Sequence, residues 1–227
     1  MRIIGALLLA LHLGADQPVP SEVDPTGWET VVDENGIKVI AKHFPGTGLL
    51  AVRGERIIDE PIRRVAWIML DDPRAHEWVD DLAEERVVRQ VSGHEYIEYN
   101  HISMPPLVTD RDFVTDVSIS LDPASKSFLM HSHSIDDPGV GDTGLLRGNI
   151  TYSVIRCTAV DNGKRTQVVM EMHMDPRGYL PHWLVNYFQK HWPQGAFQGM
   201  TKQLAKPDLK APPEWHEVLD PLDAWSS

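Results

Sequence analysis

Side chains that could transfer protons or recognise a polar group are concentrated in two short segments. In EYIEYNHI, Tyr96, Glu98 and Asn100 are two positions apart. Side chains at that spacing lie on one face of a β-strand. In KSFLMHSHSI, His131 and His133 have the same spacing. A carboxylic acid, a phenol and imidazoles gathered in a cavity could act as acids and bases or select a polar ligand group.

The histidines do not form a convincing metal site. His131 and His133 could provide two ligands and His173 a third. However, His173 is at an odd position of RTQVVMEMHM, whereas the apolar row of that segment is at even positions. The three imidazoles are therefore not expected to converge, and we predict no metal and no cofactor. The single cysteine, Cys157, excludes an internal disulfide.

Composition and charge favour one soluble domain that does not bind nucleic acid. The 227 residues are 42% hydrophobic and 24% charged, which is typical of a globular chain of this length. The formal net charge is -12, and there is no basic run. Nucleic acid and anionic membranes are poor partners for such a chain. Any membrane contact is expected to be transient and apolar.

The N-terminus has the pattern of a secretory signal peptide. Arg2 precedes an apolar run from residue 3 to residue 13, and Gly14-Ala15 provides small residues for cleavage. We predict a signal peptide at residues 1–15 and a Pro-rich leader at 16–27, which implies a secreted or periplasmic protein. A buried N-terminal helix is the alternative.

Hydrophobic patterning predicts strands, two helices, a run of strands and one long helix. WETVVDENGIKVIAKHF is expected to form a hairpin that turns at Asp33–Gly36, and LLAVRGERII a third strand. One helix is expected to begin at Pro61, and RAHEWVDDLAEE to be a second short helix. Five segments with period-two patterning follow, separated by turn residues: EYIEYNHI, RDFVTDVSISL, KSFLMHSHSI, LLRGNITYSVIRC and RTQVVMEMHM.

The chain ends with a long helix and a short tail. The helix is expected from Pro181 to Ala205, with a kink or break at Pro193, because a proline ring clashes with the preceding turn. Residues 206–227 are an acidic, Pro-rich tail that either docks through its tryptophans or is loose. The predicted class is α+β, with a single curved antiparallel sheet folded against a C-terminal helix.

Alternation assigns the strand faces. Phe113, Val117 and Ile119 occupy odd positions of RDFVTDVSISL and are expected to face inward. If the following turn pairs Leu121 with Ser127, three residues of the next strand also face inward. These residues are Leu129, His131 and His133.

Inward residues of the last two strands suggest a cavity. Ile150 belongs to an even row of LLRGNITYSVIRC, and Val168, Met170 and Met172 belong to an even row of RTQVVMEMHM. Methionine fills irregular apolar space, so a methionine-rich row fits either an ordinary core or a cavity wall. Because the last helix also has a large apolar face, we favour a cavity with a few polar groups.

Five segments in this order resemble the START domain, the lipid-transfer domain related to the steroidogenic acute regulatory protein. They are GIKV, HEWV, PPLVTDRDFV, GLLRG and DPRGYLPHWLVN. The resemblance extends over residues 28–204, and the RDFV and DPRGYLPHWLVN segments are its most specific parts. We assign the START-like domain to residues 28–205.

The resemblance implies a helix-grip fold, in which a curved antiparallel sheet surrounds the C-terminal helix and encloses an apolar cavity for one lipid. The helix would act as a lid. Ligands of the family include sterols, phospholipids and ceramide. The resemblance implies a binding domain and no catalytic residues. We therefore expect a monomeric binding protein for an apolar lipid that contacts membranes transiently.

The chain departs from the sterol-carrying relatives at one position. Those relatives have a buried arginine six residues after the RDF arginine, and here that position is Val117. The acidic partner of that arginine falls on Glu98. Without the arginine, Glu98 must find another donor or become protonated. We expect His131 or His133 as the donor, and the departure argues against sterol specificity.

The expected ligand-binding residues come from the sheet and from the last helix. From the sheet they are Glu98, Asn100, Phe113, Val117, Ile119, Leu129, His131, His133, Ile150, Val168, Met170 and Met172. From the helix they are Leu184, Val185, Phe188 and Trp192. By contrast, Arg111, Asp112 and Arg147 are expected to hold neighbouring loops by charge-assisted hydrogen bonds.

Two other functions stay open from the sequence. A helix-grip enzyme of the polyketide cyclase or aromatase type would use the same cavity, with Tyr96, Glu98, His131 and His133 as acids or bases. A lipid sensor would instead report its ligand to a partner through the C-terminal tail and its tryptophans.

Overall fold

The structure is a computed structural model that describes residues 26–226. The predicted signal peptide and nearly all of the predicted leader lie outside the described residues.

Within residues 26–226, ten strands form one sheet in the order β1-β2-β3-β10-β9-β7-β6-β5-β4, and β8 pairs with β6 beside this path. All neighbours are antiparallel except β6 and β8. The strands are β1 Glu29–Glu34, β2 Ile37–His43, β3 Leu50–Ile58, β4 Leu82–Ser92, β5 Glu95–Ile102, β6 Arg111–Asp122, β7 Ser127–Ser134, β8 Leu146–Arg147, β9 Asn149–Val160 and β10 Arg165–Asp175.

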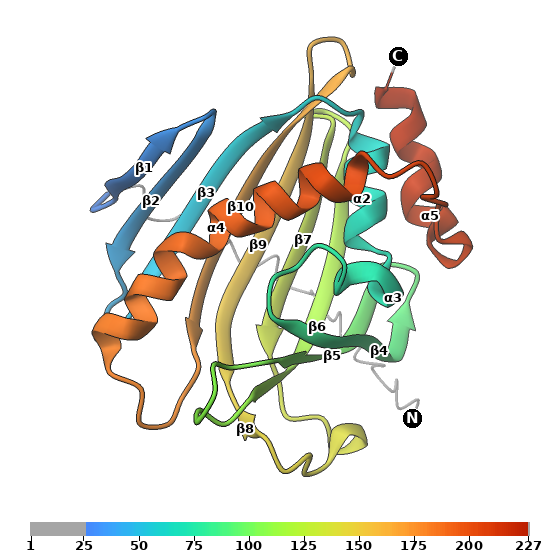
Figure 1. Cartoon of the computed structure of the whole chain (residues 1–227). Coiled ribbons are helices and arrows are strands. Elements are labelled where there is room, and N and C mark those ends of the chain that lie inside the picture. The colour runs from blue at the N-terminus through green and yellow to red at the C-terminus, as the bar shows by residue number, and fades with distance from the viewer. Residues whose placement is uncertain (1–25, 227) are drawn as a thin grey trace, which may run out of the picture.

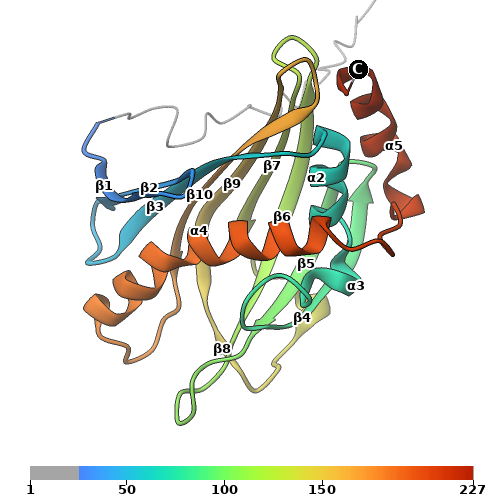
Figure 2. The ribbon, with the colours of Figure 1, turned by 45° about the horizontal axis from the view of Figure 1, so that its top comes forward.

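The helices lie at one face of this sheet. They are α2 Ile62–Met69, α3 Asp72–Ala75, α4 His182–Leu204 and α5 His216–Leu219, with short 3₁₀ turns η1 Pro138–Val140, η2 Pro213–Trp215 and η3 Asp220–Trp225. Figures 1 and 2 show the sheet curving around α4, with α2 and α5 beyond the C-terminal end of α4. The predicted α+β, helix-grip class is therefore confirmed. The sheet is not closed, since β1 and β4 are its two edges.

The predicted second helix is mostly wrong. The α3 helix ends at Ala75, and Leu82–Ser92 is strand β4. Alanine, glutamate and arginine favour a helix in isolation, but this segment hydrogen-bonds along β5 across a tight turn. Sheet pairing has overridden the local propensity.

The α4 helix continues through Pro193 from His182 to Leu204, so the predicted break is absent from this helix. The Pro193 ring packs where β3 has Gly54. A Cβ atom at Gly54 would lie 2.5 Å from the Pro193 Cβ, so the glycine makes room for the helix to approach the sheet.

The predicted register between β6 and β7 is wrong by one residue. Ser127 pairs with Asp122 rather than Leu121. The turn is shorter because Asp122 caps it, accepting hydrogen bonds from the Ala124 amide and the Ser125 hydroxyl, while Lys126 adopts a positive φ of 52°. A one-residue shift reverses the face of every side chain on β7.

The main core lies under α2, the second half of α4 and the C-terminal tail. The tail docks on this core: Trp215, Leu219 and Trp225 are at most 7% exposed. Arg63 of α2 also pairs with Asp220 and Asp223 of η3. The tail is thus part of the hydrophobic core, and deleting it would remove core residues.

Candidate functional site

The inner face of β5 and β6 contains the predicted polar residues. Glu98 lies opposite Thr115, and Asn100 lies opposite Phe113. Tyr96 pairs with Val117 on the same face. Glu98 therefore points inward, as predicted from alternation.

Four predicted wall residues belong to the packed core rather than to an opening. Val117, Ile119, Val168 and Met170 are all in the main hydrophobic cluster, and each is at most 6% exposed. Phe197 and Met200 of α4 complete this packing and are fully buried. We call these six residues the closed end of the inner face.

Most of the remaining predicted wall residues lie outside the main hydrophobic cluster of the described residues. Phe113, Met172 and Val185 are buried, yet within residues 26–226 none belongs to the main cluster. Glu98, Asn100, Ile150 and Leu184 are only half-buried, and Phe188 is 49% exposed. We call these eight residues the open end. Trp192 is half-buried against the main cluster, between the two ends.

Ile150 reaches the inner face through an irregularity in the sheet. The β9–β10 register shifts between His173 and Met174, so that Ile150 pairs with Met174 while Tyr152 pairs with His173. Tyr152 lies on the outer face, where its hydroxyl donates to Glu171 at 2.8 Å. The even row expected for this strand is therefore right for Ile150 and wrong for Tyr152.

Polar contacts hold the first half of α4 over the open end. The Asn186 side chain accepts from the Leu50 amide and donates to the Gly48 carbonyl, both at 3.1 Å. The Gln189 amide donates to the Met174 carbonyl at 2.6 Å. These hydrogen bonds fix the helix in place but add little apolar burial.

Apolar side chains are exposed around the same half of α4. Trp183, Tyr187 and Phe188 are 71%, 55% and 49% exposed. Leu107 in the β5–β6 loop and Tyr179 in the β10–α4 loop are fully exposed. Figures 1 and 2 show both loops at one end of the molecule. These exposed apolar side chains therefore lie on the first half of α4 and on two loops at the same end of the molecule.

The predicted structural role of Arg111 and Asp112 is confirmed. Arg111 donates to the backbone carbonyls of Pro176 and Arg177, both at 3.2 Å, and so ties β6 to the loop before α4. Asp112 accepts from the Arg147 guanidinium at 2.8 and 3.1 Å and is fully buried. The Arg147 and Thr143 hydrogen bonds lower the pKa of Asp112 against the opposing effect of desolvation.

Three carboxylates meet at the polar edge of the inner face. One oxygen each from Asp72 of α3, Glu85 of β4 and Glu98 of β5 lies within 4.8 Å of the others. Desolvation, followed by the charge of Asp72, raises the pKa of Glu98 to about 7, although the Asn100 and Thr115 side chains lower it. Desolvation also raises the pKa of Asp72 to about 6 and that of Glu85 well above its usual range.

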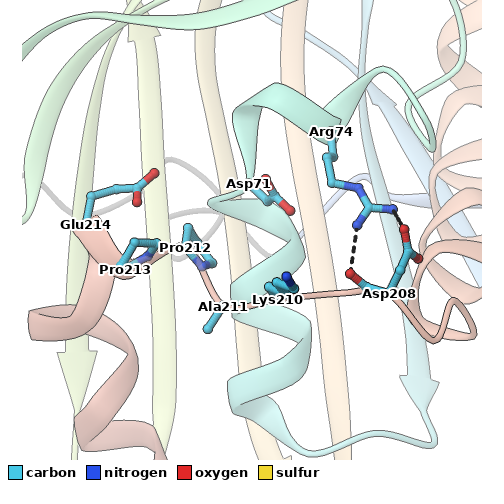
Figure 3. Close-up of a pocket in the computed structure, with 8 residues that line it drawn as sticks. All are labelled: Asp71, Arg74, Asp208, Lys210, Ala211, Pro212, Pro213 and Glu214. Atoms are coloured by element: carbon cyan, nitrogen blue, oxygen red, sulfur yellow. Dashed lines mark hydrogen bonds and ion pairs between the residues drawn. The ribbon is translucent and has the colours of Figure 1, made fainter.

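The pocket of about 500 Å³ shown in Figure 3 lies elsewhere, between α3 and the segment that follows α4. Asp71, Arg74, Asp208 and Glu214 line it, and Arg74 pairs with Asp208 at 3.2 Å. Such a charged, solvent-facing lining does not suit an apolar ligand.

Comparison with known proteins agrees with this geometry. The family model described as "START domain" matches residues 21–207. The chain belongs to the START domain family.

Individual relatives are distant. The "Uncharacterized protein PA1579" of Pseudomonas aeruginosa is 25% identical over 79% of this chain and 87% of its own. The "Phosphatidylcholine transfer protein" of Bos taurus is 24% identical over 77% of this chain and 83% of its own. The crystal structure of human STARD10 has a TM-score of 0.75 and 19% identity, covering 92% of this chain and 85% of that one.

Within this START domain, the predicted role of the histidines is wrong. His131 pairs with Ser118, and His133 with Asp116, on the outer face; Leu129, opposite Ser120, is there as well. Glu98 instead accepts from the Asn100 amide at 2.7 Å. It thus has another donor as well as a raised pKa, as expected without the arginine. The acid–base set of Tyr96, Glu98, His131 and His133 does not assemble.

The sequence reasoning missed Asp72 and Glu85. The sequence predicts a helix for RAHEWVDDLAEE, which contains Glu85, and gives no sign that Asp72 or Glu85 lies beside Glu98. A period-two pattern from Leu82 onward could have identified β4 as a strand. Charged residues on both faces of that strand hide the pattern.

Within residues 26–226, no helix is long and apolar enough to span a bilayer.

Proposed function

We propose that this START domain binds and shields one apolar lipid between the open end of the sheet and the first half of α4, for transfer between membranes or for sensing. The observation that carries the proposal is that, within residues 26–226, the side chains of the open end lie outside the main hydrophobic cluster, while apolar side chains on the first half of α4 are exposed. Apolar burial would provide most of the affinity, at about 25 cal/mol per Å² before the costs of association.

The exposed apolar residues around α4 would make transient contact with a membrane. Trp183, Tyr187 and Phe188 are on the helix that would open, and Leu107 and Tyr179 are on adjacent loops. The net charge of -12 disfavours anionic surfaces. We therefore propose that zwitterionic membranes are donors at least as good as anionic ones. Glu98 and Asn100 would contact the polar part of the lipid.

We propose that the protein is secreted or periplasmic, on the basis of the signal-like N-terminus. Fractionation of cells that express the full chain tests the location: mature protein lacking residues 1–15 is expected outside the cytoplasm.

Transfer of a fluorescent phospholipid between zwitterionic vesicles tests the function. The wild-type protein is expected to accelerate transfer, and Phe188→Glu to slow it at least about tenfold, since a charge would be buried against lipid. Gln198→Glu is the matched control, because Gln198 is exposed on the second half of α4. No acceleration by the wild type with phospholipid, sterol or fatty acid would contradict the proposal.

A further inference from the structure

Three acidic side chains from separate elements converge without a basic partner. Glu85 lies opposite Asn100, and Glu98 opposite Val87, so both glutamates are on the inner face of neighbouring strands. Asp72 approaches from α3, and the three oxygens lie within 4.8 Å of one another. Within residues 26–226, no lysine, arginine or histidine forms an ion pair with any of the three.

Such an arrangement is unfavourable unless something positive neutralises it. Like charges at this separation repel strongly where water is largely excluded. Asp72 is 8% exposed, and its Oδ1 atom has no hydrogen-bond partner within the described part of the chain. The hydrogen bond that Glu98 accepts from Asn100 comes from a neutral donor and supplies no positive charge. The fold therefore holds acceptor oxygens together without providing their counter-charge.

A second, independent feature points at the same place. The Tyr96 side chain is fully buried, and within residues 26–226 its hydroxyl has no hydrogen-bond partner. Tyr96 precedes Glu98 by two positions on the inner face of β5, so the two side chains lie on the same face of the strand. A buried phenol is rarely left unpaired unless a ligand or its hydration completes the site.

We propose that Asp72, Glu85 and Glu98 bind one hard divalent cation, with Ca²⁺ preferred. Ca²⁺ takes six to eight oxygen ligands at about 2.3–2.6 Å, so oxygens that are at most 4.8 Å apart can contact one ion. Three carboxylates offer up to six oxygens. We expect the unpaired Tyr96 hydroxyl to hydrogen-bond a water bound to the ion.

The types of ligand atom favour Ca²⁺ over other metal ions. The cluster contains oxygen donors and no histidine or cysteine, which disfavours zinc and copper. Mg²⁺ requires a stricter octahedral arrangement and gives up its water reluctantly. The three ligands come from α3, β4 and β5 and none from α4, although Glu98 also belongs to the open end that is proposed to bind lipid.

Two further carboxylates, Asp71 and Glu214, act on Asp72 from the side of α3. Asp71, the neighbour of Asp72, lines the pocket shown in Figure 3 together with Glu214. Both carboxylates add negative potential at Asp72. A cation that enters this region is therefore attracted toward the cluster.

Calorimetric titration of the EDTA-treated, dialysed full chain with CaCl₂ at pH 8 tests the site. One saturating ion per chain is expected, together with a rise in Tm. Tb³⁺ in place of Ca²⁺ is expected to show luminescence excited through Tyr96, displaced by Ca²⁺.

Replacing one carboxylate by a neutral amide is expected to raise Tm without the ion and to weaken binding of the ion. Glu85→Gln and Glu98→Gln are expected to raise Tm when no divalent cation is present, because repulsion is relieved. Both are expected to weaken Ca²⁺ binding at least about tenfold. Glu84→Gln is the matched control, since Glu84 is the exposed neighbour of Glu85 and pairs with Arg86; it should bind Ca²⁺ like the wild type.

Two results would overturn the site. One is no binding heat and no change in Tm of the wild type up to about 10 mM CaCl₂, above the range of the weakest natural Ca²⁺ sites. The other is unchanged Ca²⁺ affinity in both glutamine variants. A Tm increase with a long-chain alkylammonium ion but none with Ca²⁺ would likewise reject a metal site.

Discussion

The two halves of α4 are both rich in apolar residues, but their surroundings differ. In the second half, Phe197, Met200 and Leu204 are at most 3% exposed and pack against the main core. In the first half, Trp183, Tyr187 and Phe188 are about half exposed or more. Hydrogen bonds from Asn186 and Gln189 hold that half to the sheet.

The second half of α4 therefore contributes mainly to stability, whereas the first half is the part proposed to take part in ligand binding. Packing at the closed end fixes the helix to the sheet and does not require a ligand. At the open end, hydrogen bonds of modest net strength supplement the burial of a few side chains such as Val185, and such contacts can break and re-form. The first half of α4 is thus the part suited to act as a lid.

The largest expected effect is the contrast between two phenylalanines. Phe197→Ala at the closed end should lower the free energy of unfolding by about 3–5 kcal/mol, because it leaves a cavity in packed core. Phe188→Ala at the open end should change it by less than about 0.5 kcal/mol, because the ring is largely exposed. Urea unfolding of both variants measures the contrast, and equal losses would contradict the division into two ends.

A smaller effect is expected from the hydrogen bonds that hold the lid. Gln189→Ala should destabilise the protein by about 1–3 kcal/mol, because the partly buried Met174 carbonyl loses its partner. Hydrogen exchange should rise selectively in the first half of α4, and lipid exchange should become faster. Gln198→Ala is the control at an exposed position. A uniform rise in exchange along α4 would show that the halves do not open separately.

Stability should depend on pH through the carboxylate cluster. The folded-state pKa of Glu98 is about 7 and that of Asp72 about 6, both above their unfolded values. The folded state therefore binds more protons, so these groups stabilise the fold at low pH and lose that contribution as pH rises from about 4.5 to about 7.

Glu98→Gln isolates this dependence. With EDTA present, the Tm of the variant minus that of the wild type should grow from pH 4.5 to pH 8. The subtraction is needed because desolvation lowers the pKa of His173, which makes stability rise with pH over part of the same window. A difference that stays constant across this range would refute a raised pKa at Glu98.

The smallest effect is expected on the outer face of the sheet. His133 is exposed and pairs with Asp116 there. His133→Ala should change stability by less than about 0.5 kcal/mol and leave lipid transfer unaffected. Slower transfer in a vesicle assay would show that the outer face contributes to the ligand site.

The sequence predicts the faces of some strands well and others poorly, for a physical reason. In β6, polar Ser118 and Ser120 alternate with Val117 and Ile119, so the inward row is unambiguous. In β7, Phe128, Leu129 and Met130 are consecutive, so alternation alone does not choose a face. The choice then depends on the turn length, which the Asp122 cap sets.

The candidate site could be predicted only in part. Glu98 and Asn100 follow from alternation in β5, whereas the acidic cluster depends on long-range contacts between α3, β4 and β5. Local composition suggests a helix for Glu85, and only pairing of β4 with β5 brings it near Glu98. The packing of Val168 and Met170 likewise depends on α2 and the docked tail, which periodicity does not reveal.

Native mass spectrometry of the purified full chain, followed by organic extraction, tests the central claim most directly. We predict one lipid per protein, with occupancy reduced in Phe188→Glu and retained in Gln198→Glu. A protein that is lipid-free, and stays so after incubation with phospholipids, sterols and fatty acids, would contradict the account of the open end as a lipid site.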